Sequence, residues 1–434
     1  MNGDVLVQLA SADPADLLPA RRSEEAAQVV RPLTAAAASD LGGSTSYLLL
    51  EDARGVTYGV PAVRRQGRLA RARAGDGVAA EIVAAVVSGR TEIDGLELTA
   101  FAGEPAASGE RAIDVDQTND LVVVGERAIV KWFLHPTAGE QPAVERLAAL
   151  ESTAFSGTPR TWGLVHRRVG DDRFLVATVT AYLAGAEDGW DWAVADVRAL
   201  ARGEGVVASA LDPVHEAGRL IGSLHASLAA AGVGEASPGD AARWLGRARD
   251  DLARADLEPA VAGLVDARLA SLGDCVGTPT ILVHGDLHIG QILRAGEPAR
   301  YYVIDFDGNP TQSIEERLER QPAARDVAGM LASLDHVGRV VLHRTEGLGD
   351  AERARVLGWI EEAQRAFLGS YEAEIGHGGH PELLDRALLG AMQVQQECRE
   401  YVYAARYLPH WRYVPDAALT ALLSRSAVPR SEAT

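Results

Sequence analysis

Two carboxylates and one amide are spaced along this chain as a phosphoryl-transfer site would require. The apolar run Ile281-Leu282-Val283 leads into His284-Gly285-Asp286, and Gln291 follows five residues after the aspartate. A second apolar run, Tyr301 to Ile304, leads to Asp305. One carboxylate would orient an attacking hydroxyl and accept its proton, and the other oxygens would hold magnesium at the phosphates. The alternative is a hairpin-like pair of strands with solvated acidic turns.

Two other chemistries are disfavoured by the same residues. His284 and His288 flank Asp286 and invite a zinc interpretation, but no HExxH glutamate is present and a loop is predicted there. A serine hydrolase is disfavoured because the chain has no GxSxG elbow.

Length and charge limit the possible architectures and partners. A chain of 434 residues exceeds what one hydrophobic core usually serves, so we expect two or three lobes. A net charge of -19 disfavours nucleic acid and anionic membranes as partners. The same acidity suits a cationic ligand, although it more often reflects plain solubility.

Cysteine usage and the absence of long apolar runs predict a soluble cytoplasmic protein. Cys275 and Cys398 lie far apart without metal spacing, so we expect free, buried thiols in a reducing compartment. We find neither a signal peptide nor a run of eighteen apolar residues. The sequence leaves open whether the protein is a monomer or a homodimer.

The first 110 residues are expected to form a small α+β unit. Short β-like runs and one amphipathic helix, Gly77 to Ser88, alternate there. The runs are Val5–Leu9, Ser46–Leu50 and Thr57–Val60. Residues 42–45 (GGST) lack a Walker lysine, so we interpret them as a hairpin turn and not as a phosphate loop.

A lysine and a glutamate further on are spaced as a nucleotide-binding pair would be. A turn at 116–120 precedes a strand, and the next strand, Ala128 to Leu134, contains Lys131. Glu145 falls in the first turn of a helix that starts at Pro142. A strand lysine held by a helix glutamate is how kinases position the α- and β-phosphates. The alternative is that Lys131 extends to solvent.

The strand Phe174 to Thr180 ends in a short connection, residues 181–185, before a mainly helical remainder. We interpret this connection as either a hinge whose backbone at Ala181 and Leu183 pairs with adenine or an ordinary linker. Downstream, we expect His225 to be a core residue. Asp326 lies at the start of a helix and is expected to cap it.

HGDLHIGQIL followed by VIDFDG resembles the catalytic and metal-binding segments of the aminoglycoside phosphotransferase-like, protein-kinase-like family, and bacterial maltokinases in particular. The resemblance runs from about Asp114 to the C-terminus. It extends to Lys131, the Pro-Ala-Val-Glu segment, the Asp-Gly-Trp at 188–190 and the Arg-Asp-Val-Ala-Gly-Met at 325–330.

This resemblance implies a bilobal α+β fold and roles for individual residues. Asp286 would be the catalytic base, Gln291 and Asp305 the Mg²⁺ ligands, and Lys131 with Glu145 the pair that positions ATP. The implied domains are an N-terminal cap at 1–110, a β-rich nucleotide lobe at 111–184 and a helical lobe at 185–434. Two departures are that Gln291 stands where most relatives have asparagine, and that residues 116–120 contain no glycine.

The C-terminal segment at 393–415 has the residues of a sugar site. On a helix, the four polar residues Gln393, Gln396, Glu397 and Glu400 fall within an arc roughly 100° wide. Trp411 and four tyrosines follow, in a chain with only 5% aromatic residues. Carboxylates and amides beside aromatic rings suit a sugar, and two carboxylates favour an amino sugar. A solvated acidic helix face is the alternative.

The same segment resembles the sugar-binding signature of actinobacterial glucosamine kinases. The resemblance implies ATP-dependent phosphorylation of glucosamine at carbon 6, with His288 among the substrate-binding residues. A maltose 1-kinase, an aminoglycoside kinase and a nucleotide-binding pseudokinase remain the alternatives.

Overall fold

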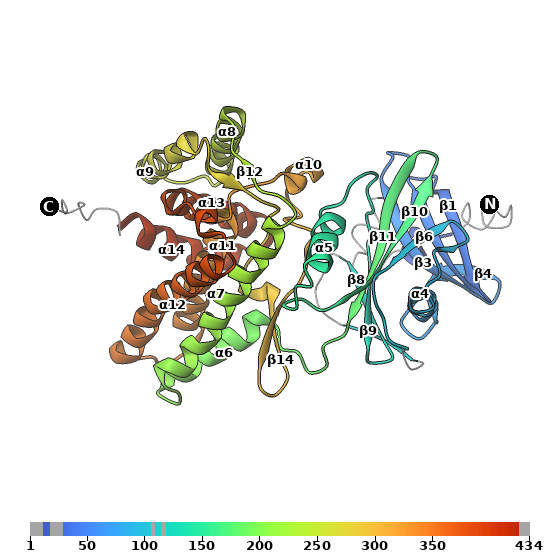
Figure 1. Ribbon diagram of the computed structural model, residues 1–434, viewed down its shortest axis with the longest axis horizontal. Coiled ribbons are helices and arrows are strands. Elements are labelled where there is room, and N and C mark those ends of the chain that lie inside the picture. The colour runs from blue at the N-terminus through green and yellow to red at the C-terminus, as the bar shows by residue number, and fades with distance from the viewer. Residues whose placement is uncertain (1–11, 18–28, 106–108, 114–118, 425–434) are drawn as a thin grey trace. The chain divides into compact units, whose positions relative to one another are not determined.

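The computed structural model describes residues 12–17, 29–105, 109–113 and 119–424. The predicted strand Val5–Leu9 and residues 116–118 of the predicted turn lie outside these ranges. The chain forms two compact units. One comprises the residues up to Val144 with Pro159–Ala184, and the other comprises Glu145–Thr158 with Gly185–Thr434. Strands dominate the first unit and helices the second (Figure 1).

Two antiparallel sheets build the described part of the first unit. One sheet has the order β1-β2-β3-β4 and the other has the order β5-β6-β10-β11-β9-β8-β7. The strands are β1 Thr34–Gly42, β2 Thr45–Glu51, β3 Thr57–Arg65, β4 Arg68–Arg71, β5 Glu92–Ile93, β6 Leu96–Ala100, β7 Glu110–Ala112, β8 Asp120–Val124, β9 Ala128–Trp132, β10 Thr161–Val169 and β11 Asp172–Ala181. Gly42 and Gly43 make the turn between β1 and β2 with positive φ, which confirms the hairpin interpretation.

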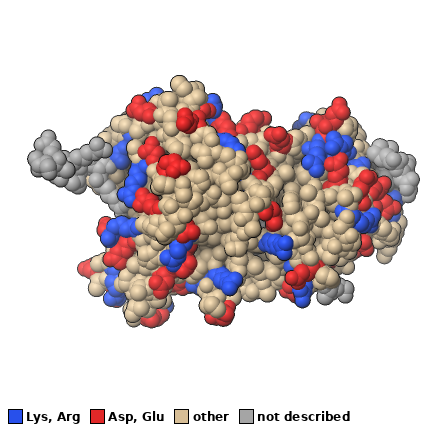
Figure 2. Space-filling view, in the orientation of Figure 1, with Lys and Arg blue, Asp and Glu red and all other residues tan. Residues whose placement is uncertain are grey.

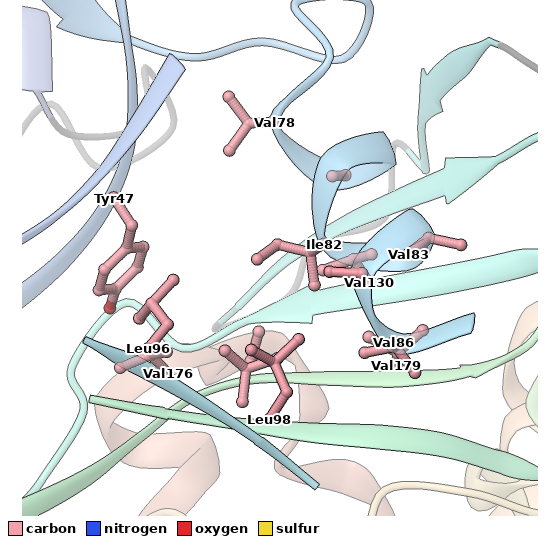
Figure 3. Packing of buried hydrophobic residues seen from close by; sticks show 14 of the residues in the cluster. Tyr47, Val78, Ile82, Val83, Val86, Leu96, Leu98, Val130, Val176 and Val179 are labelled. Carbon is pink, nitrogen blue, oxygen red and sulfur yellow. The ribbon is translucent and has the colours of Figure 1, made fainter. Parts of the chain in front are cut away.

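Two helices belong to the described part of this unit, α2 (Pro14–Leu17) and α4 (Val78–Val87). The helix predicted at 77–88 is therefore confirmed as α4. Its buried face includes Ile82 and Val86, which pack with Val130 and Val179 of the larger sheet (Figure 3). Each buried side chain of this kind contributes about 1.5–3 kcal/mol through the hydrophobic effect. Because β5 and β6 pair into the sheet that holds β8 and β9, the boundary at residue 110 stays a prediction.

The second unit is mainly helical, and α5 (Pro142–Ser152) passes from the first unit into it. Its other α-helices are α6 Gly189–Arg202, α7 Val207–Ala229, α8 Pro238–Arg254, α9 Pro259–Leu269, α10 Ile314–Leu318, α11 Ala324–Arg344, α12 Asp350–His377, α13 Leu389–Tyr407 and α14 Tyr413–Ser424. Short elements connect them: η2 Ala270–Asp274, η3 Ile289–Gln291, η4 Pro381–Leu383, η5 Arg386–Leu388, η6 Pro409–Trp411, β12 Gly234–Glu235, β13 Pro279–Thr280, β14 Ile292–Ala295 and β15 Arg300–Val303.

The long helices α7 and α12 lie side by side (Figure 1). They approach so closely that a Cβ on Gly218 would lie 2.5 Å from Phe367 O. This packing brings His225 Nδ1 within 2.8 Å of the Tyr371 hydroxyl. His225 is completely buried, which confirms the prediction that it is a core residue.

The charge distribution on the surface and the state of the two cysteines can be compared with the sequence analysis. On the face shown in Figure 2, acidic and basic side chains are interspersed and not gathered by sign. Cys275 and Cys398 are free and buried, as predicted. Among the helices that the structure describes, none is long and apolar enough to span a membrane.

Candidate functional site

The loop that carries Asp286 is tied down by the histidine before it. His284 is completely buried, and its Nε2 lies 2.9 Å from Ile304 O. Its Nδ1 accepts a hydrogen bond from Asp286 N at 3.3 Å, so the proton of a neutral imidazole lies on Nε2. Burial lowers the pKa of His284, which agrees with a neutral ring. Both ring nitrogens are thus occupied by the chain, and neither is left for zinc.

Asp326 does not cap its helix, so that prediction is wrong. The N-cap of α11 is Ala323, and the Asp326 carboxylate instead accepts the backbone N–H groups of His284 at 2.6 Å and Gly285 at 2.9 Å. His225 Nε2 lies 3.1 Å from the same carboxylate. Although burial opposes ionisation, the hydrogen bonds from His225 and Gly285 lower the pKa of Asp326 to about 2. Asp326 is therefore a buried anion that holds the backbone on which Asp286 sits.

The proposed metal ligands lie on neighbouring backbone segments. Gln291 ends η3, and Asp305 follows β15. Ile304 N donates to Gln291 O at 3.0 Å, which brings the two segments together. Asp305 is exposed and adopts a left-handed φ of 67°, a conformation uncommon outside glycine. His288 is also exposed, with its Nε2 at 3.4 Å from Gln291 Nε2.

A carboxylate and an amide oxygen form a donor set that suits Mg²⁺. The described residues include no cluster of three or more His, Cys, Asp or Glu side chains around one point. A divalent ion would therefore complete its shell with phosphate oxygens and water, which is the usual arrangement where Mg²⁺ binds a nucleotide. The residues present fit that ion, and the ligand roles of Gln291 and Asp305 stay predictions.

Two arginines to which the sequence analysis assigned no role, Arg146 and Arg325, hold the backbone of the loops that follow Val283 and Asp305. Arg146 of α5 is buried and donates to Phe306 O at 2.8 Å and to Arg317 O at 2.7 Å. Arg325 donates to Gly285 O at 3.2 Å. Burial lowers the pKa of Arg146 to about 10. The signal that could have found Arg146 is a lone arginine on the apolar side of a helix, next to Glu145.

Asn309 contacts the predicted base directly, and it too was missed. Its Nδ2 donates to Asp286 Oδ1 at 2.8 Å. The available signal was an Asn-Pro pair immediately after the IDFDG segment, because such pairs begin tight turns and so place the asparagine precisely.

The predicted nucleotide residues lie in different units. Lys131 is half-buried in β9 of the first unit, with its Nζ 5.5 Å from the centre of the Phe133 ring, whereas Glu145 is exposed on α5 and belongs to the second unit. Ala181 ends β11 and donates its N–H to Arg160 O at 2.9 Å. Leu183, two residues later, is half-buried. The pairing of Lys131 with Glu145 and the adenine contacts stay predictions.

The C-terminal helix α13 brings part of its predicted sugar face together. Gln396 Nε2 donates to Glu400 Oε1 at 3.2 Å, and Trp411 Nε1 donates to Glu400 Oε2 at 3.3 Å. Trp411 also lies beside Trp190, with ring centres 5.6 Å apart. We call Gln396, Glu400, Trp411 and Trp190 the tryptophan–carboxylate cluster. This cluster places a carboxylate and an amide beside two indole rings.

The other two residues of the predicted arc point elsewhere. Gln393 lines a small cavity with Asp335 and Gln364. Glu397 is completely buried, and both its carboxylate oxygens lie about 3 Å from His336 Nε2 of α11, at 3.0 and 3.1 Å. Burial raises the pKa of Glu397, and the His336 imidazolium opposes that rise. A direct contact of Gln393 or Glu397 with a sugar stays a prediction.

The His336–Glu397 pair predicts a dependence of stability on pH. Burial disfavours the charged ring, but Glu397 raises the pKa of His336 to about 9, against about 6.5 in an unfolded chain. A raised pKa stabilises the fold fully below pH 6.5, and the contribution is lost as the pH rises towards 9. Because the pKa of Glu397 is raised as well, the reference is the double variant His336→Gln/Glu397→Gln, which removes both titrating groups. The free energy of unfolding of the wild type, minus that of this variant, should therefore fall by on the order of 2 kcal/mol over this range. Urea unfolding at pH 6 and pH 9.5 measures it, and a difference that stays constant or grows would contradict the charged pair.

The first turn of α6 connects the tryptophan–carboxylate cluster to the catalytic loop. Asp188 caps α6 by accepting Trp190 N at 2.8 Å. Gly189 packs directly on η3, where a Cβ would lie 1.8 Å from Ile289 O. Trp190 therefore directly follows a residue that packs on η3, and its ring lies beside that of Trp411. That the cluster and the Asp286 loop form one site stays a prediction.

Residues 116–359 match the phosphotransferase enzyme family. The chain belongs to this family. It is a phosphoryl-transferring enzyme, and the predicted kinase-like α+β fold is confirmed. This phosphotransferase is 46% identical to a glucosamine kinase from Streptacidiphilus jiangxiensis over 431 residues, covering 96% of this chain and 97% of the relative. It is 41% identical to a glucosamine kinase from Mycolicibacterium smegmatis, covering 88% and 97%.

Solved structures agree with these relatives. A glucosamine kinase in crystal form B is 43% identical, with a TM-score of 0.85, and covers 98% of this phosphotransferase and 100% of the solved chain. A glucosamine kinase in complex with glucosamine, ADP and inorganic phosphate has the same identity and coverage and a TM-score of 0.82. The resemblance predicted from the sequence motifs is therefore confirmed.

Proposed function

We propose that this phosphotransferase is a glucosamine kinase, which transfers the γ-phosphoryl group of ATP to the hydroxyl at carbon 6 of glucosamine. The tryptophan–carboxylate cluster, whose Trp190 follows the Gly189 that packs on η3, is the observation that carries this proposal. It is supported by relatives that match nearly the whole chain and are glucosamine kinases, one of them solved with glucosamine, ADP and inorganic phosphate.

The cluster has the chemistry that an amino sugar requires. Glu400 would pair with the ammonium group, and the amide of Gln396 would bond a hydroxyl, because each is a polar group on the half-buried face of α13. The ring of Trp411 or Trp190 would lie against the C–H face of the sugar. His288, exposed in the catalytic loop, would contact the hydroxyls near the reacting atom.

The predicted nucleotide residues would hold ATP. Lys131 would contact the α- and β-phosphates and be oriented by Glu145. Adenine offers a donor at its amino group and an acceptor beside it, so the Ala181 carbonyl and the Leu183 N–H would match it. Gln291 and Asp305 would hold Mg²⁺, which neutralises charge on the phosphates.

Asp286 would orient the acceptor hydroxyl and take its proton. As the hydroxyl oxygen forms a bond to the γ-phosphorus, the bond from that phosphorus to the β–γ bridging oxygen breaks, and ADP leaves with the electron pair. The proton passes from the hydroxyl to the carboxylate and then to solvent. The buried anion Asp326 and the arginines Arg146 and Arg325 hold the two loops so that this geometry is already present before substrate binds.

The cap at 1–110, the nucleotide lobe at 111–184 and the helical lobe at 185–434 are part of the same proposal. We place the enzyme in the cytoplasm, where ATP is available and its two free thiols stay reduced. It would act on small molecules as a monomer or a homodimer, without nucleic acid or membrane as a partner.

A coupled ADP-release assay over five acceptors tests the substrate. We expect saturable turnover with glucosamine and at least tenfold lower kcat/KM with N-acetylglucosamine, glucose, maltose and kanamycin, because only glucosamine combines an ammonium group with a monosaccharide ring. Turnover of maltose without glucosamine would establish a maltose kinase, and preference for kanamycin an aminoglycoside kinase. Nucleotide binding without any turnover would favour a pseudokinase.

Replacing Glu400 by Gln separates recognition of the ammonium group from general damage. This variant keeps an acceptor for Trp411 Nε1 but removes the charge. The preference for glucosamine over glucose should fall about tenfold, while kcat/KM for glucose changes little. An unchanged preference would assign the ammonium group to another carboxylate.

A further inference from the structure

A tight turn places Asn309 beside Asp286. Gln312 N donates to Asn309 O at 3.1 Å, and Pro310 occupies the second position, where type I turns favour proline. Gly308 precedes the turn with a φ of 72° and packs on the catalytic loop, because a Cβ on Gly285 would lie 3.7 Å from Gly308 Cα. The backbone thus brings residue 309 against residue 286.

The orientation of the Asn309 amide is determined by the chain itself. Thr311 N donates to Asn309 Oδ1 at 2.9 Å, and the Thr311 hydroxyl donates to the same atom at 2.5 Å. An atom that accepts a backbone N–H must be the amide oxygen, so the other atom is the NH₂ nitrogen. This Nδ2 donates to Asp286 Oδ1 at 2.8 Å.

The two carboxylate oxygens of Asp286 therefore differ in their hydrogen bonding. Among the described residues, Oδ1 accepts the hydrogen bond from Asn309, and Oδ2 accepts none. The side chain of Asp286 can rotate about its Cα–Cβ and Cβ–Cγ bonds unless something holds one oxygen, and Asn309 does so from a rigid turn.

We propose that Asn309 is a positioning residue for the transfer step, which fixes Asp286 Oδ1 so that Oδ2 is presented to the acceptor hydroxyl. This inference rests on the proposed role of Asp286 as the base. It concerns the orientation of the base and not the identity of the sugar, so it holds for any acceptor that the enzyme uses.

Asn309 has a simpler role that must be separated from this one, because asparagine also stabilises turns through its Oδ1. Aspartate and serine keep that acceptor and are favoured at the same turn position. Asn309→Asp therefore preserves the turn but replaces the donor by a second carboxylate oxygen, which repels Asp286. Asn309→Ser preserves the turn acceptor, but its hydroxyl is on a shorter side chain than the amide nitrogen, so it withdraws the donor from Asp286 without adding a charge.

Steady-state kinetics of the full-length enzyme decide between the two roles. With saturating ATP and acceptor, we expect kcat to fall about tenfold in Asn309→Ser and about a hundredfold in Asn309→Asp, with both KM values within about threefold of wild type. The control Gln66→Glu adds the same charge on the exposed turn between β3 and β4 and should leave kcat unchanged. Thermal unfolding should show that every variant is folded.

A double variant makes the test specific to Asp286. In the Asp286→Asn background, Asn309→Asp should cause no further loss of the residual rate, because the repelled carboxylate is gone. A wild-type kcat for Asn309→Asp, combined with an inactive Asp286→Asn, would overturn the positioning role and leave the proposed function intact. A wild-type kcat for Asp286→Asn would overturn the role of Asp286 as the base, on which this inference rests, whereas failure of the proposed function itself would appear as no turnover of glucosamine by the wild-type enzyme. If Asn309→Asp lowered the rate by the same factor in the wild-type and Asp286→Asn backgrounds, Asn309 would act only by stabilising the turn.

Discussion

We expect Asp286→Asn to lower kcat about 10²- to 10⁴-fold, with the affinity for ATP close to that of the wild type. The amide has the shape of the carboxylate but cannot accept the hydroxyl proton. The Asp326 anion and the Ile304 contact of His284 do not involve the Asp286 carboxylate, so the loop backbone should keep its conformation. Single-turnover phosphoryl transfer measures the step, and calorimetric titration with a non-hydrolysable ATP analogue measures the affinity.

The matched control for this experiment is Glu315→Gln. It makes the same chemical change on an exposed carboxylate of α10, outside the site. Its kcat should lie within about twofold of wild type, in the range expected for surface substitutions. If Asp286→Asn retained the wild-type rate, the proton would have to be accepted elsewhere and the proposed mechanism would be wrong.

Asp326→Asn is the substitution expected to cost the most stability. The wild-type carboxylate is 1% exposed and accepts two backbone N–H groups besides its contact with His225. An amide presents an NH₂ group to at least one of these donors and removes the buried charge. We expect the free energy of unfolding to fall by about 3–5 kcal/mol, as when one partner of a buried ionic network is removed. Equilibrium unfolding in urea at pH 7 measures it.

The pH dependence of this loss has a definite sign. The pKa of Asp326 is lowered to about 2, so its stabilising contribution is complete above the unfolded value of about 3.9 and is lost as the pH falls towards 2. The difference between the wild type and Asp326→Asn should therefore shrink on acidification from pH 5 to pH 2.5. The control Asp256→Asn, on an exposed loop residue, should stay within about 0.5 kcal/mol of wild type. A loss below 1 kcal/mol at pH 7 would show that the buried anion is not needed to hold the loop.

The family and the local arrangement of the Asp286 loop could be predicted because their signals are contiguous in the chain. Asp286, Gln291 and Asp305 are separated by short apolar runs whose strand character brings them to neighbouring turns, and Ile304 and Gln291 indeed meet through their backbones. Helical periodicity also predicted α4 and the polar arc on α13, since both depend only on the order of residues within one element.

The partners of those residues could not be predicted, because they come from distant parts of the chain. Asp326 was predicted to be a helix cap. Its carboxylate oxygens instead contact the backbone of Gly285, 41 residues earlier, and the ring of His225, 101 residues earlier. The signals at Asn309 and Arg146 are local and do not name a partner, so these residues acquire a role only when the turn after Asp305 and the helix α5 pack against the loops.

The polar face of α13 shows the same division most clearly. Periodicity placed Gln396, Glu397 and Glu400 on one arc, and all three lie within α13. Periodicity could not tell which neighbour each side chain would meet. Glu397 is buried and contacts His336 of α11, whereas Glu400 is half-buried and contacts Trp411. Residue order within an element sets the direction of each side chain, but the burial and charge that decide its chemistry come from elements that only packing brings beside it.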